Sequence, residues 1–302
     1  MNIKKILTYF SVAVSFAAYA QNTNERLQII DVSQAQIRLM NACKDKDSAA
    51  CAGIFADSLY KPYYEFWSGY VGEEKDFTDW MIGEAMPAIK LYNERNNAID
   101  GTKLLKQFDE IKKRMKKLTH YSPEGKWYIV YGPAWTDLGG LLGGIMLIDL
   151  SHEHNNSNDN IVSIFPHELT HQIMSNVNKN IDTTALGPVI GEGFAVFMNQ
   201  LYWKDKYSPA QNLGYTEDEL RQCEMEQETI KKYFNENKFS SDKNIIDSFR
   251  NRGAHITKNL PGAIGYYIGY QIVKSYVNKH GKQSWKDVFV KTPMEIYLQS
   301  EY

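Results

Sequence analysis

The chain has 302 residues and a net charge of −2, and 43% of its residues are hydrophobic and 23% charged. This composition is typical of a globular protein that buries a substantial core in one large domain or two modest ones. The near-neutral charge gives no footprint for a polyanion, so we expect no nucleic-acid partner.

The N-terminus has the features of a secretory signal peptide. Lys4 and Lys5 precede an apolar run from residue 6 to residue 18, and Ala18-Tyr19-Ala20 matches the small-x-small cleavage pattern. We predict a signal peptide over residues 1–20 and export to the periplasm or the exterior. No later apolar run is long enough to cross a bilayer, so we expect no transmembrane segment after signal removal.

The region from residue 21 to residue 120 is predicted to be mostly helical, with turns between the helices. The stretch from Gly101 to Leu118 is the clearest helix, because Leu104, Phe108 and Met115 lie on one apolar face.

Three cysteines are present, and two of them are close in sequence. Cys43 and Cys51 can bridge across a short turn, which an exported protein permits. We slightly favour this disulfide; the alternative is that both, together with Cys223, are free thiols.

The hydrophobic period then changes to that of strands. Residues 126–131 and 144–149 are predicted strands, and we expect the second to pair with an extended peptide as an added edge strand. The linker over residues 138–144 is rich in glycine but lacks the Lys-Ser/Thr of a phosphate loop, which argues against nucleotide binding. His152-Glu153-His154 follows and is interpreted as exposed polar sequence.

Residues 167 to 171 read His167-Glu168-Leu169-Thr170-His171, an HExxH motif with apolar neighbours at helical spacing. Residues four apart share one face of a helix, so both imidazoles can reach one metal ion. Glu168 points beside that ion, where it can take a proton from an activated water. Pro166 lies either in the first turn of this helix or inside a longer helix that starts near Asn160. The alternative interpretation of the motif is a surface helix with two idle histidines.

A candidate third ligand, Glu192, stands 21 residues after His171, between Gly191 and Gly193. Two histidines and a glutamate from a following helix hold the zinc of gluzincins and leave a fourth position for water. The alternative is an acidic residue that opens a helix, with the glycines forming a tight turn into it. We favour the ligand role and expect one Zn²⁺ ion. Val196 stands where some gluzincins carry an aspartate that orients a histidine, so that acceptor must come from elsewhere.

The chain beyond residue 190 is predicted to be helical almost to its end. Thr216 and Glu219 form a capping box for a helix that reaches about Asn235. Another helix runs from Ala263 to about Asn278, and a short final one begins at Pro293. We therefore predict an α+β fold that is mainly helical, with a small sheet before the HExxH helix, a helical C-terminal subdomain and a cleft between the two parts.

Three stretches carry a resemblance to a known family: Phe165-Pro166-His167-Glu168-Leu169-Thr170-His171, Gly191-Glu192-Gly193 and residues 265–273. Together they resemble the predicted zinc-dependent proteases of unknown function that are related to gliding-motility lipoprotein B. The resemblance covers roughly the C-terminal half, with weaker similarity in the N-terminal part. It implies a zincin-like metallopeptidase in which His167, His171 and Glu192 are zinc ligands and Glu168 is the base.

Residues 265–273 repeat a Gly-Tyr pair at helical spacing, with Gly265 and Gly269 four apart and Tyr266 and Tyr270 four apart. Glycine inside a helix costs about 1 kcal/mol relative to alanine and usually allows another backbone to come close, so helix packing is one explanation. The functional interpretation is that Tyr266 or Tyr270 donates a hydrogen bond to the oxyanion of the tetrahedral intermediate.

Three basic residues between Gly193 and the Gly-Tyr repeat of residues 265–273 are further candidates for binding the substrate or the oxyanion. His255 is a rival oxyanion donor, and Arg250 or Arg252 can bind a substrate carboxylate.

We predict three regions: the signal peptide at 1–20, a helical N-terminal region at 21–120 and a zincin-like metallopeptidase domain at 121–302. The predicted function is an exported zinc metallopeptidase that hydrolyses peptide or protein substrates, with metal-activated water and a glutamate base. The competing function is a non-catalytic envelope assembly or binding protein on the same scaffold. A third possible function, intermediate between these two, is a zinc hydrolase that acts on non-peptide amides.

Overall fold

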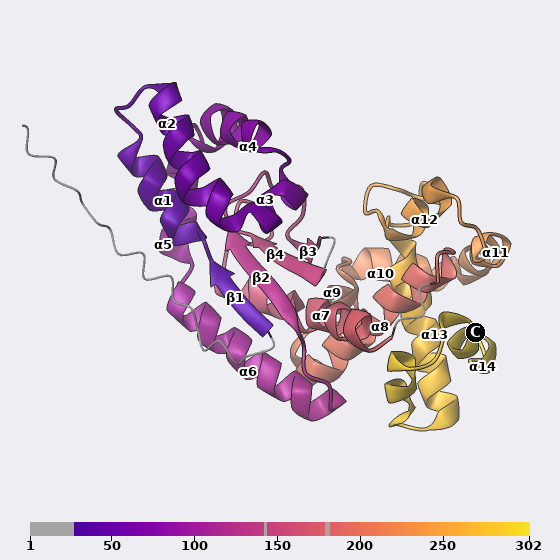
Figure 1. The fold of residues 1–302 in the computed structure, drawn as a ribbon. Helices are drawn as coiled ribbons and strands as arrows, with labels where there is room; N and C mark the ends of the chain where they lie inside the picture. The colour runs from indigo at the N-terminus through magenta and orange to yellow at the C-terminus, as the bar shows by residue number, and fades with distance from the viewer. Residues whose placement is uncertain (1–26, 142–143, 179–181) are drawn as a thin grey trace, which may run out of the picture.

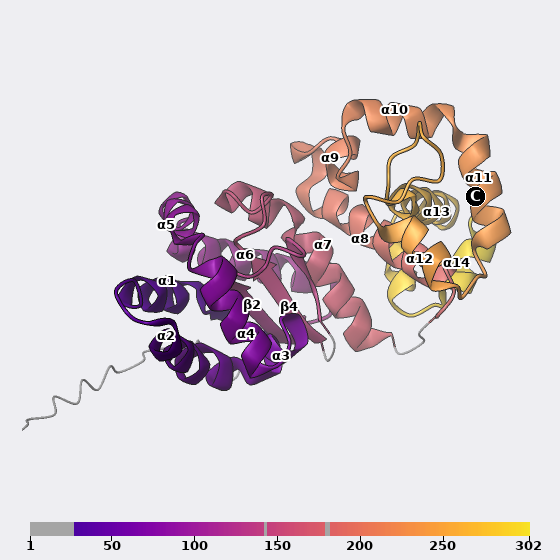
Figure 2. The same cartoon turned by 90° about the horizontal axis from the view of Figure 1, so that it is seen from above.

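The computed structural model describes residues 27–141, 144–178 and 182–302, and the predicted signal peptide lies outside these ranges. Both views show two lobes: the N-terminal helices with the sheet form one, and α9 to α14 form the other (Figures 1 and 2). Helices α7 and α8 lie between them. The fold is α+β and mainly helical, as the sequence predicts.

A four-stranded sheet has the order β1-β2-β4-β3. Its strands are β1 (Leu27–Asp31), β2 (Gly125–Val130), β3 (Leu138–Gly140) and β4 (Ile145–Asp149). The first three strands in this order are parallel, and β3 is antiparallel to β4. Every residue of β4 is buried, as expected for an apolar strand covered on both faces.

Both predicted strands are present, but the expected edge position of the second is wrong. β4 pairs with β2 on one side and with β3 on the other, so the edge strands are β1 and β3. Residues 138–140, which form β3, lie in the stretch predicted to be a glycine-rich linker. Three residues, two of them glycine, show no strand periodicity, and only pairing with β4 makes them a strand.

The segment between β1 and β2 is helical, as predicted. Its α-helices are α1 (Ser33–Ala42), α2 (Ser48–Phe55), α3 (Tyr64–Tyr70), α4 (Glu74–Trp80), α5 (Ile89–Ala98) and α6 (Gly101–Thr119). Two short π-helices, η1 (Ala56–Tyr60) and η3 (Met81–Ala85), and a 3-10 helix, η2 (Lys61–Tyr63), lie among them. The side chain of Asp100 caps α6 by accepting from the Lys103 N–H, and His120 ends it in the left-handed region. Because β1 pairs with β2, the chain on the two sides of residue 120 shares one sheet.

The second half is helical after β4. It contains α7 (Asn158–Val177), α8 (Leu186–Trp203), η5 (Lys204–Lys206), α9 (Pro209–Leu213), α10 (Glu217–Met225), α11 (Gln227–Asn237), α12 (Lys243–Arg250), α13 (Ile264–His280), η6 (Ser284–Phe289) and α14 (Pro293–Gln299). The capping box of Thr216 and Glu219 is present. The single helix predicted from Thr216 to about Asn235 is instead split into α10 and α11, because the backbone of Glu226 (ψ 24°) leaves the helical region.

The three cysteines are buried free thiols, so the favoured disulfide is absent. Cys43 caps the C-terminal end of α1, and Cys51 lies within α2. The Cys51 thiol donates a hydrogen bond to the Cys43 carbonyl oxygen at 3.4 Å. Burial raises the pKa of the Cys43 thiol to about 12, which keeps it protonated and unreactive.

One cluster of buried apolar side chains runs from Leu27 to Ile296. α6 packs on α7, and α7 packs on α8, which in turn packs on α13. This chain of contacts holds the HExxH helix between the sheet and the C-terminal helices. In the described ranges no helix is both long and apolar enough to cross a bilayer.

Candidate metal centre

The HExxH motif lies in the middle of α7, whose first turn is capped by the Ser157 side chain. Pro166 is therefore inside a long helix, as one of the two alternatives predicted, and Thr170 Oγ1 bonds to the Pro166 carbonyl oxygen at 2.8 Å. The helical spacing brings the Nε2 atoms of His167 and His171 to 3.1 Å from each other. Two imidazole nitrogens thus point at one position, as the motif predicts.

Glu192 of α8 completes the cluster. Its Oε2 atom lies 3.3 Å from Nε2 of His167 and 3.1 Å from Nε2 of His171. Glu192 does not open its helix after a glycine turn, because α8 begins at Leu186 and both flanking glycines are helical. The position of the carboxylate is set by the packing of α8 on α7.

The three ligand atoms fit a zinc ion. They form a nearly equilateral triangle with sides of 3.1, 3.1 and 3.3 Å. Zinc bonds of about 2.0–2.1 Å in tetrahedral geometry separate neighbouring ligand atoms by about 3.3–3.4 Å. Two imidazole nitrogens and one carboxylate oxygen are also a donor set that zinc favours.

The charges of the cluster suit a cation as well. Burial lowers the pKa of His167, so its ring is neutral near pH 7. Burial acts in the same direction on His171, but Glu192 and Glu168 outweigh it and raise the His171 pKa to about 9. Burial opposes ionisation of Glu192, yet the two histidines hold its pKa well below the usual value. Without an ion, His171 is therefore protonated near pH 7, and its charge lies beside the ionised Glu192 carboxylate.

Glu168 lies beside this triangle, outside it. Its Oε1 atom is 3.9 Å from Nε2 of His167, and its side chain is 14% exposed. Burial is the main reason that the pKa of Glu168 is raised to about 8; the charge of His171 opposes this, while Glu192 and Asp137 add to it. The carboxyl group therefore titrates near neutral pH, which suits proton transfer.

The two candidate tyrosines have different surroundings. The Tyr266 ring is parallel to the His167 ring, with an interplanar angle of 6° and centroids 5.9 Å apart. Burial, then the charges of Glu192 and Glu168, raise the pKa of Tyr266, so its phenol stays a hydrogen-bond donor. Tyr270 instead donates to Gln200 Oε1 at 2.5 Å. The structure brings Tyr266 to the cluster and gives Tyr270 a structural partner elsewhere.

Gly193 and Gly269 lie where α8 and α13 cross, whereas a Cβ atom on Gly191 would have no neighbour within 4 Å. A Cβ atom on Gly193 would lie 1.9 Å from the Gly269 carbonyl carbon, and one on Gly269 would lie 1.8 Å from the Val189 carbonyl oxygen. A Cβ on Gly265 would meet the Phe249 carbonyl oxygen at 2.7 Å. Helix packing therefore explains Gly193, Gly265 and Gly269, and the close crossing of α8 and α13 carries Tyr266 to the cluster.

The three basic candidates also differ in their contacts with the cluster. Nε of Arg250 is 3.8 Å from Oε1 of Glu192, and its side chain is 54% exposed, so it can still meet a ligand. Arg252 stacks on the Tyr266 ring at 4.8 Å and donates to the carbonyl oxygens of Leu213 and Gly214. The Nδ1 atom of His255 faces the carbonyl oxygen of Leu260, in its own loop, at 2.7 Å.

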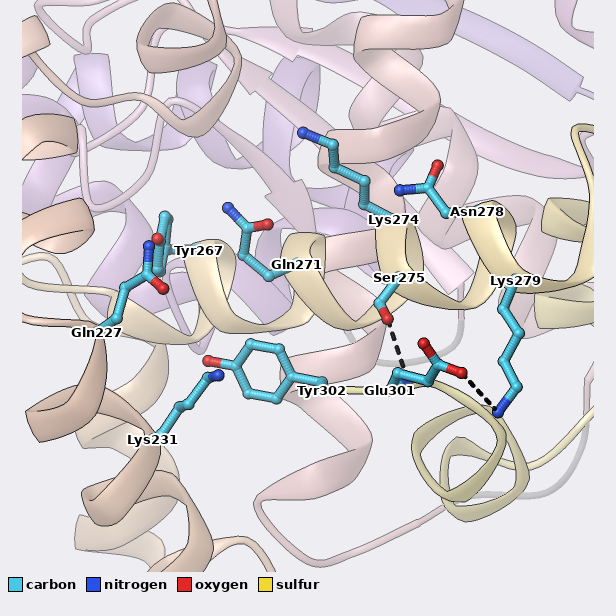
Figure 3. A pocket seen from close by; sticks show the side chains of 10 residues that line it. All are labelled: Gln227, Lys231, Tyr267, Gln271, Lys274, Ser275, Asn278, Lys279, Glu301 and Tyr302. Carbon is cyan, nitrogen blue, oxygen red and sulfur yellow. Dashed lines mark hydrogen bonds and ion pairs between the residues drawn. The ribbon is translucent and has the colours of Figure 1, made fainter.

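Two cavities lie away from the cluster. One, of about 200 Å³, lies between α7, α8 and α14. The other, of about 490 Å³, is drawn in Figure 3 and is lined by Gln227, Lys231, Tyr267, Gln271, Lys274, Ser275, Asn278, Lys279, Glu301 and Tyr302. Neither contains a residue of the cluster, which reaches solvent through the partly exposed side chains of His171 and Glu168.

Residues 155–302 match the model of a family described as gliding motility protein GldB. This segment, slightly less than half of the chain, is similar to GldB. The matched segment begins just before α7 and contains the three candidate ligands, Glu168 and all of α13. No curated protein and no solved structure matches the chain.

Proposed function

We propose that the chain is a zinc-dependent metallopeptidase with a zincin-like active site. The observation that carries the proposal is the triangle of ligand atoms from His167, His171 and Glu192, with sides close to those of a zinc coordination polyhedron. A zinc ion held there supplies a Lewis acid that activates water and polarises the scissile carbonyl.

Glu168 is the proposed general base. It stands beside the ligands, is nearly buried, and has a pKa raised to about 8 by that burial. Such a carboxylate accepts a proton from the attacking water and returns it to the leaving amine. Tyr266 is the proposed oxyanion donor, because its protonated phenol lies against the ring of His167.

The proposed substrate is an extended peptide. β3 is one of the two edge strands of the sheet and contacts α7, so a peptide that pairs with β3 runs beside the HExxH helix. Gly139 and Gly140 add no bulky side chain there, which favours main-chain binding over side-chain selection. Arg250, exposed beside Glu192, suits a carboxylate of the substrate.

The signal-like residues 1–20 support export, so the proposed substrates are envelope or extracellular proteins.

The test compares purified wild-type protein with Glu168→Gln and with Glu110→Gln, which removes an exposed carboxylate on α6. We expect one zinc ion in the cluster of all three proteins. Cleavage of a peptide mixture of varied sequence, followed by mass spectrometry, should fall about 10²- to 10⁴-fold in Glu168→Gln alone. Zinc-loaded wild-type protein that cleaves no peptide, or an undiminished Glu168→Gln variant, refutes the peptidase proposal.

A second candidate function is non-catalytic assembly or binding in the cell envelope. It is favoured by the family match, because the description of that family names gliding motility and no reaction. Cells that carry Glu168→Gln in place of the wild-type gene separate the two functions. Normal cell behaviour with Glu168→Gln, together with a defect when the whole gene is deleted, supports the assembly role.

A further inference from the structure

A second group of metal-binding side chains lies outside the HExxH cluster. Asp137, His152 and His154 each offer a ligand atom, and these atoms lie within 4.8 Å of one another. Nδ1 of His154 is 3.4 Å from Oδ2 of Asp137, and the two imidazole rings have centroids 4.8 Å apart. His152-Glu153-His154 was predicted to be exposed polar sequence. Nothing in the sequence indicated that the Asp137 carboxylate, from another loop, lies beside the two histidines.

The two loops that carry these residues leave adjacent parallel strands at the same edge of the sheet. Asp137 follows β2, and the two histidines follow β4. The buried carboxylate of Asp149, at the end of β4, accepts from the backbone N–H groups of Gly132, Ala134 and Ser151. One side chain therefore fixes the start of both loops.

Further bonds hold the loops against each other close to the group. The Asn155 amide donates to the carbonyl oxygens of Asp137 and Asp149, both at 2.8 Å. Arg95 donates to the carbonyl oxygens of Leu150, at 2.7 Å, and of His152. The three candidate ligands thus stand on backbone that is already positioned, which lowers the entropy cost of binding an ion.

Exposure and donor type indicate which ion can enter. The side chains of His154 and Asp137 are 69% and 31% exposed, so a hydrated cation reaches them from solvent. Two imidazoles and one carboxylate suit Zn²⁺, Cu²⁺ or Ni²⁺, whereas Mg²⁺ and Ca²⁺ prefer oxygen ligands. The backbone N–H of His154 donates a long hydrogen bond of 3.3 Å to Nδ1 of His152. This bond must break if Nδ1 of His152 is to bind the ion.

We propose that Asp137, His152 and His154 form a second metal site, which binds a zinc-type divalent cation with ligands separate from those of the HExxH cluster. The ion joins the loop after β2 to the loop after β4 on the side of the sheet edge that leads into α7. The site is more exposed than the HExxH cluster and holds its ion more weakly.

The test counts metal ions in untagged, metal-free protein titrated with Zn²⁺ against a chromophoric chelator. We expect two ions per chain in the wild type and in Glu153→Gln, which alters the residue between the two histidines. We expect one ion, of the tighter class, in the His152→Ala/His154→Ala double variant. The His167→Ala/His171→Ala double variant is expected to keep only the weaker ion, so failure of the HExxH cluster to bind is distinguished from failure of this site.

The proposal is overturned if the His152→Ala/His154→Ala variant binds as many ions as the wild type with the same affinities. It is also overturned if Glu153→Gln loses as much binding as that variant. Circular dichroism shows whether each variant is folded. If the His152→Ala/His154→Ala variant is not folded, Asp137→Asn replaces it. The Cu²⁺ electron paramagnetic resonance spectrum of the His167→Ala/His171→Ala variant must then show imidazole nitrogen ligands. A spectrum of aqueous Cu²⁺ in that variant contradicts the proposal.

Discussion

Zinc binding at the HExxH cluster should strengthen nearly tenfold for each pH unit between pH 6.5 and pH 8. Over this range His167 is neutral and Glu192 is ionised, so His171 carries the one proton that competes with the ion. Because the pKa of His171 is raised to about 9, binding must displace that proton at every pH below this value.

The size of the effect follows from the same value. Two pH units below a pKa of about 9, the apparent affinity at pH 7 is about 100-fold weaker than its limit at high pH, or about 2.7 kcal/mol. The number of protons released on binding is expected to be about 0.9 at pH 8 and about 0.5 at pH 9.

The assay uses the His152→Ala/His154→Ala background, so that only one site titrates. Zinc affinity is measured against a chromophoric chelator at several pH values, with correction for protonation of the chelator. Calorimetry in two buffers of different ionisation enthalpy counts the released protons. An affinity that does not change with pH refutes the reasoning, and a hundredfold change per pH unit shows that a second ligand is also protonated.

Glu168→Gln is an internal check on this assignment. The Glu168 carboxylate is not a proposed ligand, but its charge contributes to the raised pKa of His171. The variant should keep the tenfold slope and reach its high-pH limit at a lower pH than the parent protein.

Three further predictions concern the surroundings of the cluster. In metal-free protein, Glu168→Gln should raise the free energy of unfolding at pH 9, by at most about 5 kcal/mol, and change it little at pH 5. The Glu168 pKa is raised from 4.5 to about 8, so stability from its bound proton is lost as pH rises through that range. Gly269→Ala should lower the unfolding free energy by about 2 kcal/mol or more in denaturant titrations, because its Cβ would lie 1.8 Å from the Val189 carbonyl oxygen. Tyr266→Phe should lower kcat for peptide hydrolysis about 100-fold with little change in KM.

Each prediction has a matched control or a contrary outcome. Gly53→Ala places a Cβ in open space within α2 and should stabilise the protein by about 0.5–1 kcal/mol. Equal effects of Gly53→Ala and Gly269→Ala contradict the close crossing of α8 and α13. Tyr270→Phe loses its bond to Gln200 and should keep kcat, so a loss as large as that of Tyr266→Phe removes the oxyanion assignment. A Glu168→Gln effect that is the same at pH 5 and pH 9 contradicts the raised pKa.

The sequence predicted the parts of the site that depend on local geometry. His167 and His171 are four residues apart, and helical spacing alone places their nitrogens near one point. The helix caps and β4 were predicted for the same reason, since capping boxes and apolar runs act over a few residues.

Tertiary structure decided what depends on contacts between distant segments. Glu192 lies inside α8 and reaches the histidines because α8 packs on α7. The glycine turn of the alternative interpretation is absent. The close crossing of α8 and α13 at their glycines decides that Tyr266, and not Tyr270, lies beside the cluster. β3 is a strand only because it pairs with β4, and that pairing places it at the edge beside α7.

The group of Asp137, His152 and His154 shows the same limit most clearly. His152 and His154 were visible as a pair, but Asp137 joins them through parallel pairing of β2 and β4, which brings two loops to one edge of the sheet. The sequence by itself determined a helix with two histidines on one face, and it predicted the type of ligand that they offer to a metal ion. Which carboxylates and phenols surround each pair of histidines was decided by helix crossings and strand order, because those contacts join residues that local spacing does not relate.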